Sequence, residues 1–360
     1  MNQTMFPRPR IGLLGLTLQL YQRKVPECLP GLEKFSVQLS RTLTRNADVF
    51  VWPMSWDKTG TGQAAKLFQQ KKVDGVIVVF LSYASSLSHL PVLKELNRPI
   101  LLWNTQKLNT VSSSFGPQAL MENHGLHGIQ DLASVLLREG INFTLITGHW
   151  RHRGTLREIG DWCLAAAAAG RLSQSRVGRV GGRFRNMGDF ALPDDWLRQQ
   201  LGLKIIDISS NFLKTKPAGK EEPVIRKDGE DFQMTPSVNP EIKAISFRAA
   251  SCLKDMMIQK NLSAVAINFS GLKKGQVMPF LGICQLLAGG YGYGGEGDVF
   301  SATAVWLAQL LSAGQATFTE MFTADFLRQR ILMNHMGEAS LKLRRPDFPV
   351  KLAVNPMKLG

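Results

Sequence analysis

The clearest indication of the fold class is DGVIVVFL, which runs from Asp74 to Leu81. Its unbroken apolar run, rich in Val and Ile, predicts a strand buried on both faces, as the central strands of parallel sheets are. A helical pattern precedes it at Gly62 to Lys72. Another follows at Pro91 to Leu96, ahead of a second apolar strand at Pro99 to Trp103. This alternation of strands and helices predicts an α/β fold with a doubly wound parallel sheet.

The same alternation extends in both directions through the first half of the chain. Further strands are expected at Ile11 to Leu18, Val49 to Trp52 and Phe143 to Thr147, and further helices at Leu29 to Arg45, His127 to Glu139 and Thr155 to Ala169. Because such folds bind ligands beyond the carboxyl ends of their strands, we expect site residues in the loops that follow the strands.

The second half of the chain repeats the pattern after a change in composition. Ser, Gly and Arg dominate Gly170 to Arg185, which we interpret as a domain boundary. We expect an N-terminal α/β domain at 1–170, a central α/β domain at 171–315, and short strands at 316–360. The central domain is expected to hold a helix at Pro240 to Lys260, a strand at Ala264 to Phe269, and helices at Pro279 to Ala288 and Phe300 to Leu311. Lys214 to Asp231 is expected to be an exposed loop.

Charge and composition exclude several classes of protein. The net charge is +15, but the basic residues are dispersed, and their densest stretches lack the interleaved aromatics of a nucleic-acid-binding surface. We therefore expect a basic solvated surface and no nucleic-acid partner. No apolar window is long enough for a membrane span. Four widely spaced cysteines without a CxxC pair indicate reduced thiols in the cytoplasm.

Two histidine clusters follow predicted strands. His124 and His127, in NHGLHG, lie between a loop and a helix N-terminus, where an α/β domain can present groups to a ligand. The alternative is a capping turn with two partly exposed histidines. His149 and Trp150, in TGHW, could line a sugar site, because Trp offers an apolar face and an N–H donor. Alternatively, the same two side chains could pack the edge of the sheet.

The glycine-rich segment GYGGEGD contains Gly292, Gly294 and Gly297 in a GxGxxG spacing. A dinucleotide-binding fingerprint must follow a strand and open a helix. Residues 281–288 look helical instead, so a nucleotide-binding oxidoreductase is the weaker interpretation. The tight backbone would leave Glu296 exposed, which suits a ligand carboxylate. With Glu320 and His335, Glu296 forms a candidate oxygen and nitrogen ligand set for Mn²⁺ or Mg²⁺, although such spacings occur in many proteins.

These clusters, taken together, resemble the L-arabinose and L-fucose isomerase superfamily over almost the whole chain. The matching segments are LNRPILLWNTQ (Leu96 to Gln106), ENHGLHGIQDL (Glu122 to Leu132), ITGHWRHRGTLREIGDW (Ile146 to Trp162) and GYGYGGEGD (Gly290 to Asp298). The NHGLHGIQDL segment and IGLLGLTLQLYQRKVPE (Ile11 to Glu27) look closer to the less characterised, arabinose-isomerase-like branch. The resemblance implies a flavodoxin-like N-terminal domain for substrate binding and oligomerisation, then a central α/β domain. It also implies that 316–360 begins a β-rich C-terminal domain that this chain does not complete.

The resemblance further implies a divalent metal, most often Mn²⁺, held by two glutamates and two histidines. The first glutamate corresponds to Glu296, the second to Glu320, and the first histidine to His335, with spacings slightly shorter than in arabinose isomerases. The second histidine of the family lies beyond Gly360. We therefore expect this chain alone to be inactive or nearly so.

Sugar-contacting positions also carry over from the family. They correspond to Tyr21, His127, Met187, Phe269 and Met336. Three positions depart from arabinose isomerases: His124 and Leu18 each replace Gln, and Ser270 replaces Glu. These changes argue against arabinose itself as the substrate. Because the family shares its sites between subunits, the resemblance implies a homotrimer or homohexamer.

The activity implied is a metal-dependent aldose–ketose isomerisation of a pentose or deoxyhexose. Glu296 and Glu320 would move protons through an enediolate, and the metal would polarise the sugar oxygens. The alternative from another class is a non-catalytic sugar-binding or oligomer-forming remnant of such an isomerase. Metal-dependent turnover separates these two possibilities.

Overall fold

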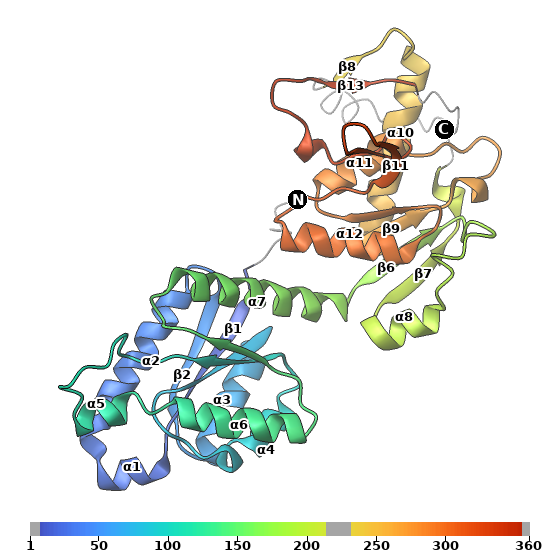
Figure 1. Cartoon of the computed structure of the whole chain (residues 1–360). Coiled ribbons are helices and arrows are strands. Elements are labelled where there is room, and N and C mark those ends of the chain that lie inside the picture. The colour runs from blue at the N-terminus through green and yellow to red at the C-terminus, as the bar shows by residue number, and fades with distance from the viewer. Residues whose placement is uncertain (1–7, 214–231, 355–360) are drawn as a thin grey trace. The chain divides into compact units, whose positions relative to one another are not determined.

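The structure, a computed structural model, describes residues 8–213 and 232–354. The loop expected at 214–231 lies outside the described residues. The chain divides into two compact units, Pro7–Gly170 and a second unit from Arg171 onward (Figure 1). No helix in the described ranges has the length and apolar character needed to cross a bilayer. All four cysteines are free thiols, as expected.

The first unit is a parallel sheet with helices on both faces (Figure 1). Its strands are β1 (Arg10–Leu16), β2 (Asp48–Ser55), β3 (Gly75–Phe80), β4 (Ile100–Asn104) and β5 (Thr144–Thr147), in the spatial order β2-β1-β3-β4-β5. Its helices are α1 (Gln19–Lys24), α2 (Leu29–Leu43), α3 (Lys58–Gln70), α4 (Leu90–Glu95), α5 (Pro117–Glu122), α6 (Leu126–Arg138) and α7 (Arg153–Leu172), with 3₁₀ turns η1 (Pro26–Cys28) and η2 (Ser86–Ser88). This strand order is that of a flavodoxin-like doubly wound sheet and confirms the predicted fold class.

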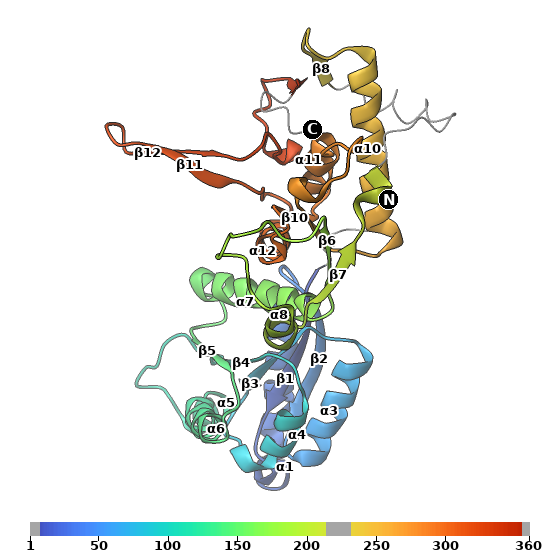
Figure 2. The same cartoon turned by 90° about the vertical axis from the view of Figure 1, so that its right-hand side faces the viewer.

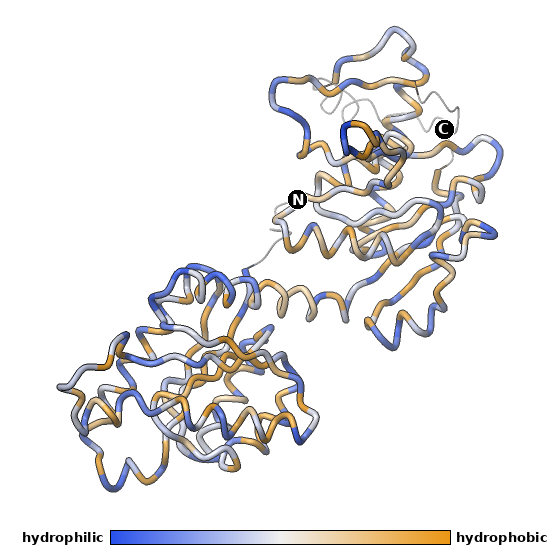
Figure 3. The backbone as a smooth tube through the Cα atoms, in the orientation of Figure 1, coloured by the Kyte–Doolittle hydropathy of each residue, from blue (hydrophilic) through white to orange (hydrophobic). Residues whose placement is uncertain are grey.

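Strand β3 lies at the centre of this unit and is buried along its whole length. Because successive side chains of a strand point to opposite faces, β3 contributes to two apolar cores. Val76 and Val78 pack with α3 and α6 on one face, and Ile77 and Val79 pack with α2 and α7 on the other. Figure 3 shows the apolar residues concentrated along the strands.

The second unit is built on a smaller parallel sheet with the order β10-β9-β6-β7. Its described elements are β6 (Arg176–Val180), α8 (Asp194–Leu201), β7 (Lys204–Ile208), η3 (Ser210–Leu213), β8 (Phe232–Met234), α10 (Pro240–Gln259), β9 (Ala264–Ile267), η4 (Phe269–Gly271), α11 (Phe280–Ala288), β10 (Gly292–Gly295), α12 (Val299–Leu311), β11 (Glu320–Asp325), β12 (Arg330–Asn334), η5 (Leu341–Leu343) and β13 (Val350–Leu352). Helices α10 and α11 pack on one face of the sheet around Val265 and Ile267. Strand β13 pairs in parallel with β8.

The glycine-rich segment forms strand β10, where the sequence had predicted no strand. A Cβ on Gly292 would lie 2.1 Å from the carbonyl oxygen of Ala302, and one on Gly294 would lie 2.3 Å from that of Asp298. The absent side chains therefore let α12 approach the strand closely. This packing explains two of the three GxGxxG glycines without a bound dinucleotide.

Strand β6 was also missed, because Arg176 and Arg179 interrupt its apolar run. It lies inside the segment whose Ser, Gly and Arg content indicated a domain boundary. The side chain of Arg179 is nevertheless largely buried, and its ion partners come from elements that follow in the chain.

An antiparallel hairpin, β11 and β12, extends from the rest of the second unit (Figure 2). It agrees with the strand-rich character expected after residue 316. Its tip is highly exposed, since Phe326 and Leu327 are each 90% exposed. At the other end, Glu320 pairs with Asn334, so the residue after β12, His335, lies beside the start of β11.

Candidate functional site

Glu296 occupies a strained turn at the carboxyl end of β10. Its φ is +56°, in the left-handed region that residues other than glycine rarely adopt. Gly297 follows with a φ of +82°, and a Cβ there would lie 2.1 Å from the Gly182 carbonyl oxygen. The Phe184 N–H donates to the Glu296 carbonyl oxygen at 2.9 Å. The loop after β6 therefore holds the turn at the edge of the sheet where α/β folds bind ligands.

His335 lies directly against this turn. A Cβ on Gly295 would lie 2.8 Å from Cε1 and 3.0 Å from Nε2 of His335, so the imidazole fits only because residue 295 is a glycine. The Phe318 ring packs edge-on against it at 4.9 Å between centroids. Nδ1 of His335 lies 2.6 Å from Oε1 of Glu338. The ring therefore has a fixed orientation, with Nε2 beside the residue that precedes Glu296.

The protonation of Glu296 reflects these neighbours. Burial raises the pKa of Glu296, and the negative charge of Glu320 raises it further, while His335 opposes the rise. Burial lowers the pKa of His335, but the hydrogen bond to Glu338 and the charges of Glu338, Glu320 and Glu296 outweigh it, so the pKa is raised overall. Glu320 is thus close enough to influence the protonation of both Glu296 and His335.

The donor atoms of Glu296, Glu320 and His335 suit a divalent cation, although the three side chains do not converge on one point. Two carboxylates and one imidazole are a typical set for Mn²⁺. Over residues 8–213 and 232–354, however, no three His, Cys, Asp or Glu side chains converge enough to hold a metal ion. Glu320 is the exposed member of the set, at the first position of β11. Its side chain can change rotamer freely, whereas that of His335 cannot.

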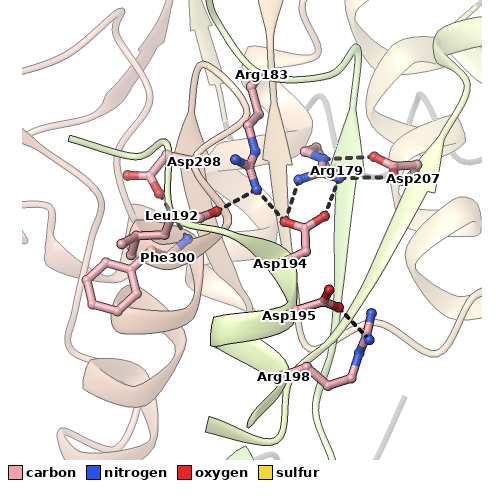
Figure 4. Close-up of polar contacts among 9 residues, drawn as sticks. All are labelled: Arg179, Arg183, Leu192, Asp194, Asp195, Arg198, Asp207, Asp298 and Phe300. Atoms are coloured by element: carbon pink, nitrogen blue, oxygen red, sulfur yellow. Dashed lines mark hydrogen bonds and ion pairs between the residues drawn. The ribbon is translucent and has the colours of Figure 1, made fainter. Parts of the chain in front are cut away.

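The loop after β6 carries Met187 and is anchored by a network of ion pairs (Figure 4). Arg179 donates to Asp207 at 2.7 Å and 3.0 Å, and to Asp194 at 3.0 Å and 2.8 Å. Arg183 reaches Asp194 as well and donates to the Leu192 carbonyl oxygen at 2.7 Å. Both ends of residues 183–192 are therefore tied to the sheet.

The remaining predicted sugar contacts of this unit lie around the same loop. Met187 is 41% exposed. Phe269 is half-buried and its ring lies 5.6 Å from that of Phe184, which is bonded to the Glu296 turn. Met336, also half-buried, follows His335 directly. Ser270 donates to Asn268 at 2.8 Å and so belongs to the turn after β9.

The predicted sugar contacts of the first unit gather at the carboxyl end of its own sheet. The Tyr83 ring lies 5.8 Å from that of His124 and 5.5 Å from that of His127, and the two imidazoles are 6.1 Å apart. Ser82 lies close to the hydroxyl of Tyr21, whose pKa is raised by burial and partly lowered again by Ser82. The structure therefore brings Tyr21, His124 and His127 into one neighbourhood.

The TGHW cluster belongs to the packing of the first unit. Trp150 packs edge-on against Phe35 at 5.9 Å, and its Nε1–H donates to the Lys107 carbonyl oxygen at 3.3 Å. Trp150 also borders the core beneath α2 and α7. The sheet-edge alternative thus describes Trp150.

Sequence reasoning missed three residues of these neighbourhoods: Tyr83, Tyr293 and Glu338. Tyr83 follows β3 at the sheet edge, which was a usable signal. Glu338 lies three residues after His335, a spacing that could have indicated a partner for the imidazole. Tyr293 lies in strand β10, which was not predicted because three of its four residues are glycines.

Two family models match the chain. The model for the L-arabinose isomerase N-terminal domain matches residues 33–174, and the model for the L-arabinose isomerase central domain matches residues 229–314. Together they cover more than half of the 360 residues.

Curated relatives agree with these models. L-arabinose isomerase 1 of Bacillus licheniformis is 26% identical over 82% of this chain and 62% of its own length. L-arabinose isomerase of Halalkalibacterium halodurans is 25% identical over 79% and 60%, and that of Leuconostoc mesenteroides is 25% identical over 93% and 74%. The chain spans about 60% of the length of the first two. It belongs to the L-arabinose isomerase superfamily.

Proposed function

We propose that this chain is a metal-dependent aldose–ketose isomerase acting on a pentose or a deoxyhexose. The observation that carries the proposal is the Glu296 turn, which presents a half-buried carboxylate to Glu320 and His335. Glu296, Glu320 and His335 would hold a divalent ion, for which their donor chemistry favours Mn²⁺. Rotation of the exposed Glu320 side chain would bring the three donors together.

The glutamates would carry the proton transfers. Glu296, whose pKa is raised, would take the proton from C2 of the aldose and return it to C1 of the ketose. Glu320 would pass the O2 proton to O1, so that no proton is gained or lost overall. When bound, the metal would polarise the adjacent sugar oxygens and favour the enediolate between aldose and ketose.

The sugar would be bound by residues of both units. Met187, Phe269 and Met336 would surround it beside the glutamates. Tyr21, His124 and His127 would reach the same sugar from a neighbouring subunit of a cytoplasmic homotrimer or homohexamer, as in the family. His124 and Ser270, which replace Gln and Glu, favour a sugar other than arabinose.

The test is to measure ketose formation from a panel of pentoses and deoxyhexoses with and without Mn²⁺, for this chain and for a fusion that adds the C-terminal domain of an L-arabinose isomerase; turnover of the variants is compared in whichever form is active. Glu296→Gln should lower turnover by about 10²-fold or more, because Gln cannot accept the proton. Glu241→Gln, an exposed glutamate of α10 in the same unit, is the matched control and should turn over normally. Ketose formation that persists in EDTA, or in Glu296→Gln, would refute the assignment.

A separate experiment tests whether each site is formed by residues of two subunits. At substrate concentrations well below KM, mixed oligomers of Glu296→Gln and His127→Gln chains should be more active than the mean of the two parent oligomers, since some sites would then combine an intact Glu296 with an intact His127. No recovery in verified mixed oligomers would place both contributions in one chain.

A second candidate is a non-catalytic sugar-binding protein. It is supported by the open arrangement of the three donors in this conformation. Sugar binding that is independent of Mn²⁺ and yields no ketose would favour it.

A further inference from the structure

Behind His335, on the side away from Glu296, lies a buried carboxylate. The Glu338 side chain is 0% exposed and that of His335 is 9% exposed. Oε1 of Glu338 lies 2.6 Å from Nδ1 of His335, a short distance typical of a strong, charge-assisted hydrogen bond. A carboxylate is rarely buried this completely without a strong polar partner.

The second oxygen of this carboxylate and the hydroxyl of the nearby Tyr293 are both buried. Among the described residues, neither Oε2 of Glu338 nor the hydroxyl of Tyr293 has a partner of ordinary hydrogen-bond geometry, and both are shielded from solvent. The two groups are close enough that Glu338 contributes to a raised pKa of Tyr293, after burial itself. Each group therefore supplies what the other lacks: Tyr293 is a donor and Oε2 an acceptor.

The Tyr293 ring also supports the imidazole indirectly. It packs edge-on against Phe318 at 5.3 Å, and Phe318 in turn packs edge-on against His335 at 4.9 Å. Tyr293 thus supports the ring of Phe318, which contacts His335 directly, while Glu338 holds Nδ1 of the same imidazole.

We propose that Glu338 and Tyr293 act as a positioning pair, in which the Tyr293 hydroxyl holds the Glu338 carboxylate and the carboxylate keeps His335 as the Nδ1–H tautomer. A neutral imidazole has one protonated nitrogen, and the hydrogen bond made by one nitrogen decides the state of the other. With Nδ1 donating to Glu338, Nε2 is left bare beside the Glu296 turn and can act as a ligand. The proposal rests on the proposed function only for the use made of Nε2, because the tautomer itself is a property of the metal-free protein.

The first measurement reads the tautomer without metal. Long-range ¹H–¹⁵N spectra distinguish protonated from bare ring nitrogens. The chain has six histidines, so a His335→Gln variant identifies the signal. At a pH above the raised pKa of His335, we expect Nδ1–H in the native protein. Glu338→Gln should give a mixture, because the Gln amide can donate to Nδ1 as well as accept from it. A native protein with Nε2–H would overturn the proposal.

The second measurement reads the consequence through Mn²⁺ affinity, by calorimetry with the metal alone. Loss of such an outer partner typically weakens metal binding 10 to 100-fold. Tyr293→Phe keeps the ring and removes only the hydroxyl, and we expect it to lose at least about tenfold in affinity. Tyr291→Phe, two residues earlier, is the matched control and should bind as the native chain does. Equal affinities for Tyr293→Phe and the native chain would remove Tyr293 from the pair.

The two measurements distinguish failure of the metal assignment from failure of the positioning pair. If the native chain binds no Mn²⁺, the metal assignment fails, yet the tautomer spectra of native, Glu338→Gln and Tyr293→Phe chains still decide the positioning proposal. If Glu338→Gln does not fold, Tyr293→Phe supplies both readouts, because its volume is nearly unchanged.

Discussion

The two units build the same kind of parallel sheet but bury different kinds of polar group. In the first unit the buried polar residues are hydroxyls and one histidine, His89, and none of the described ones is Asp, Glu, Lys or Arg. In the second unit Arg179, on β6, and Glu338, in the loop after β12, are buried. Buried charges are costly unless they are paired, so their presence in only one of the two units marks that unit as the one that uses charged groups.

The same contrast separates the two clusters at the sheet edges. In the second unit the charge of Glu320 influences the protonation of Glu296 and His335. In the first unit, Tyr83, His124 and His127 form a cluster of aromatic and imidazole rings, and Tyr21 lies beside it. We infer that the second unit carries the chemistry and the first unit the recognition of the sugar. This division of roles between the two units can be tested by four experiments.

The largest effect is expected at Glu320. Glu320→Gln should lower kcat by about 10²-fold or more, because it removes both a hard ligand and a proton carrier. Circular dichroism should be unchanged, since the side chain is exposed. A variant that keeps more than about a tenth of the native kcat would move this role elsewhere and weaken the division.

The next effect concerns His89 and the pH dependence of folding in the first unit. Burial lowers the pKa of His89 from 6.5 to about 4, with Asp57 opposing. Between pH 6.5 and about 4, His89 is therefore protonated in the unfolded chain but stays neutral in the native chain. This contribution to the free energy of unfolding is fully present above pH 6.5. It is lost as the pH falls towards 4, and the total loss is about 3 kcal/mol.

Hydrogen exchange of β3 amides as a function of pH measures this loss. His89→Gln should remove that part of the pH dependence, and His152→Gln, an exposed histidine of the same unit, should leave it in place. Identical pH profiles for the native and His89→Gln chains would contradict the prediction. The buried imidazole would then make no contribution to the acid sensitivity of this unit.

Arg179 tests the buried charge of the second unit. Arg179→Met keeps most of the buried stem but leaves Asp207 unpaired and Asp194 paired with Arg183 alone, and we expect a loss of about 2 kcal/mol. Full burial would predict about 3–5 kcal/mol. Asp207 is 71% exposed, so the effect is reduced. Hydrogen exchange in residues 183–192 should rise more than in β9. Arg198→Met, in the exposed ion pair with Asp195, is the control.

The smallest effect is expected at His127. His127→Gln should raise KM about tenfold and leave kcat nearly unchanged, because a recognition residue contributes about equally to binding the substrate and the transition state. A drop in kcat as large as that of Glu320→Gln would assign chemistry to the first unit and end the division.

The sequence predicted most of the architecture because apolar runs report burial directly. DGVIVVFL could hardly be anything other than a central strand. Strand β6 could not be recognised, because its Arg179 is compatible with burial only through Asp194 and Asp207, which come later in the chain. Strand β10 could not be recognised, because its glycines are needed for close packing against the backbone at α12. No local sequence pattern encodes that contact.

The candidate site divides in the same way. Glu296 could be singled out because its glycine neighbours indicated a tight turn. The surroundings of His335 could be predicted only in part: the spacing of Glu338 from His335 was a usable signal, whereas Tyr293 lies on another element and joins them only by packing. The relation between Glu320 and His335 likewise depends on the pairing of β11 with β12.

That pairing has a consequence for how the length of this segment can vary. Glu320 and His335 lie at the open end of the hairpin, and the residues between β11 and β12 form its exposed tip. Adding or removing residues at the tip lengthens or shortens the ribbon without displacing the open end. A one-residue insertion inside either strand would instead reverse the facing of the residues beyond it. The tip, around Phe326 and Leu327, is therefore the place to graft a peptide tag or a spectroscopic label, and the place where natural relatives can differ in length at no cost to the site.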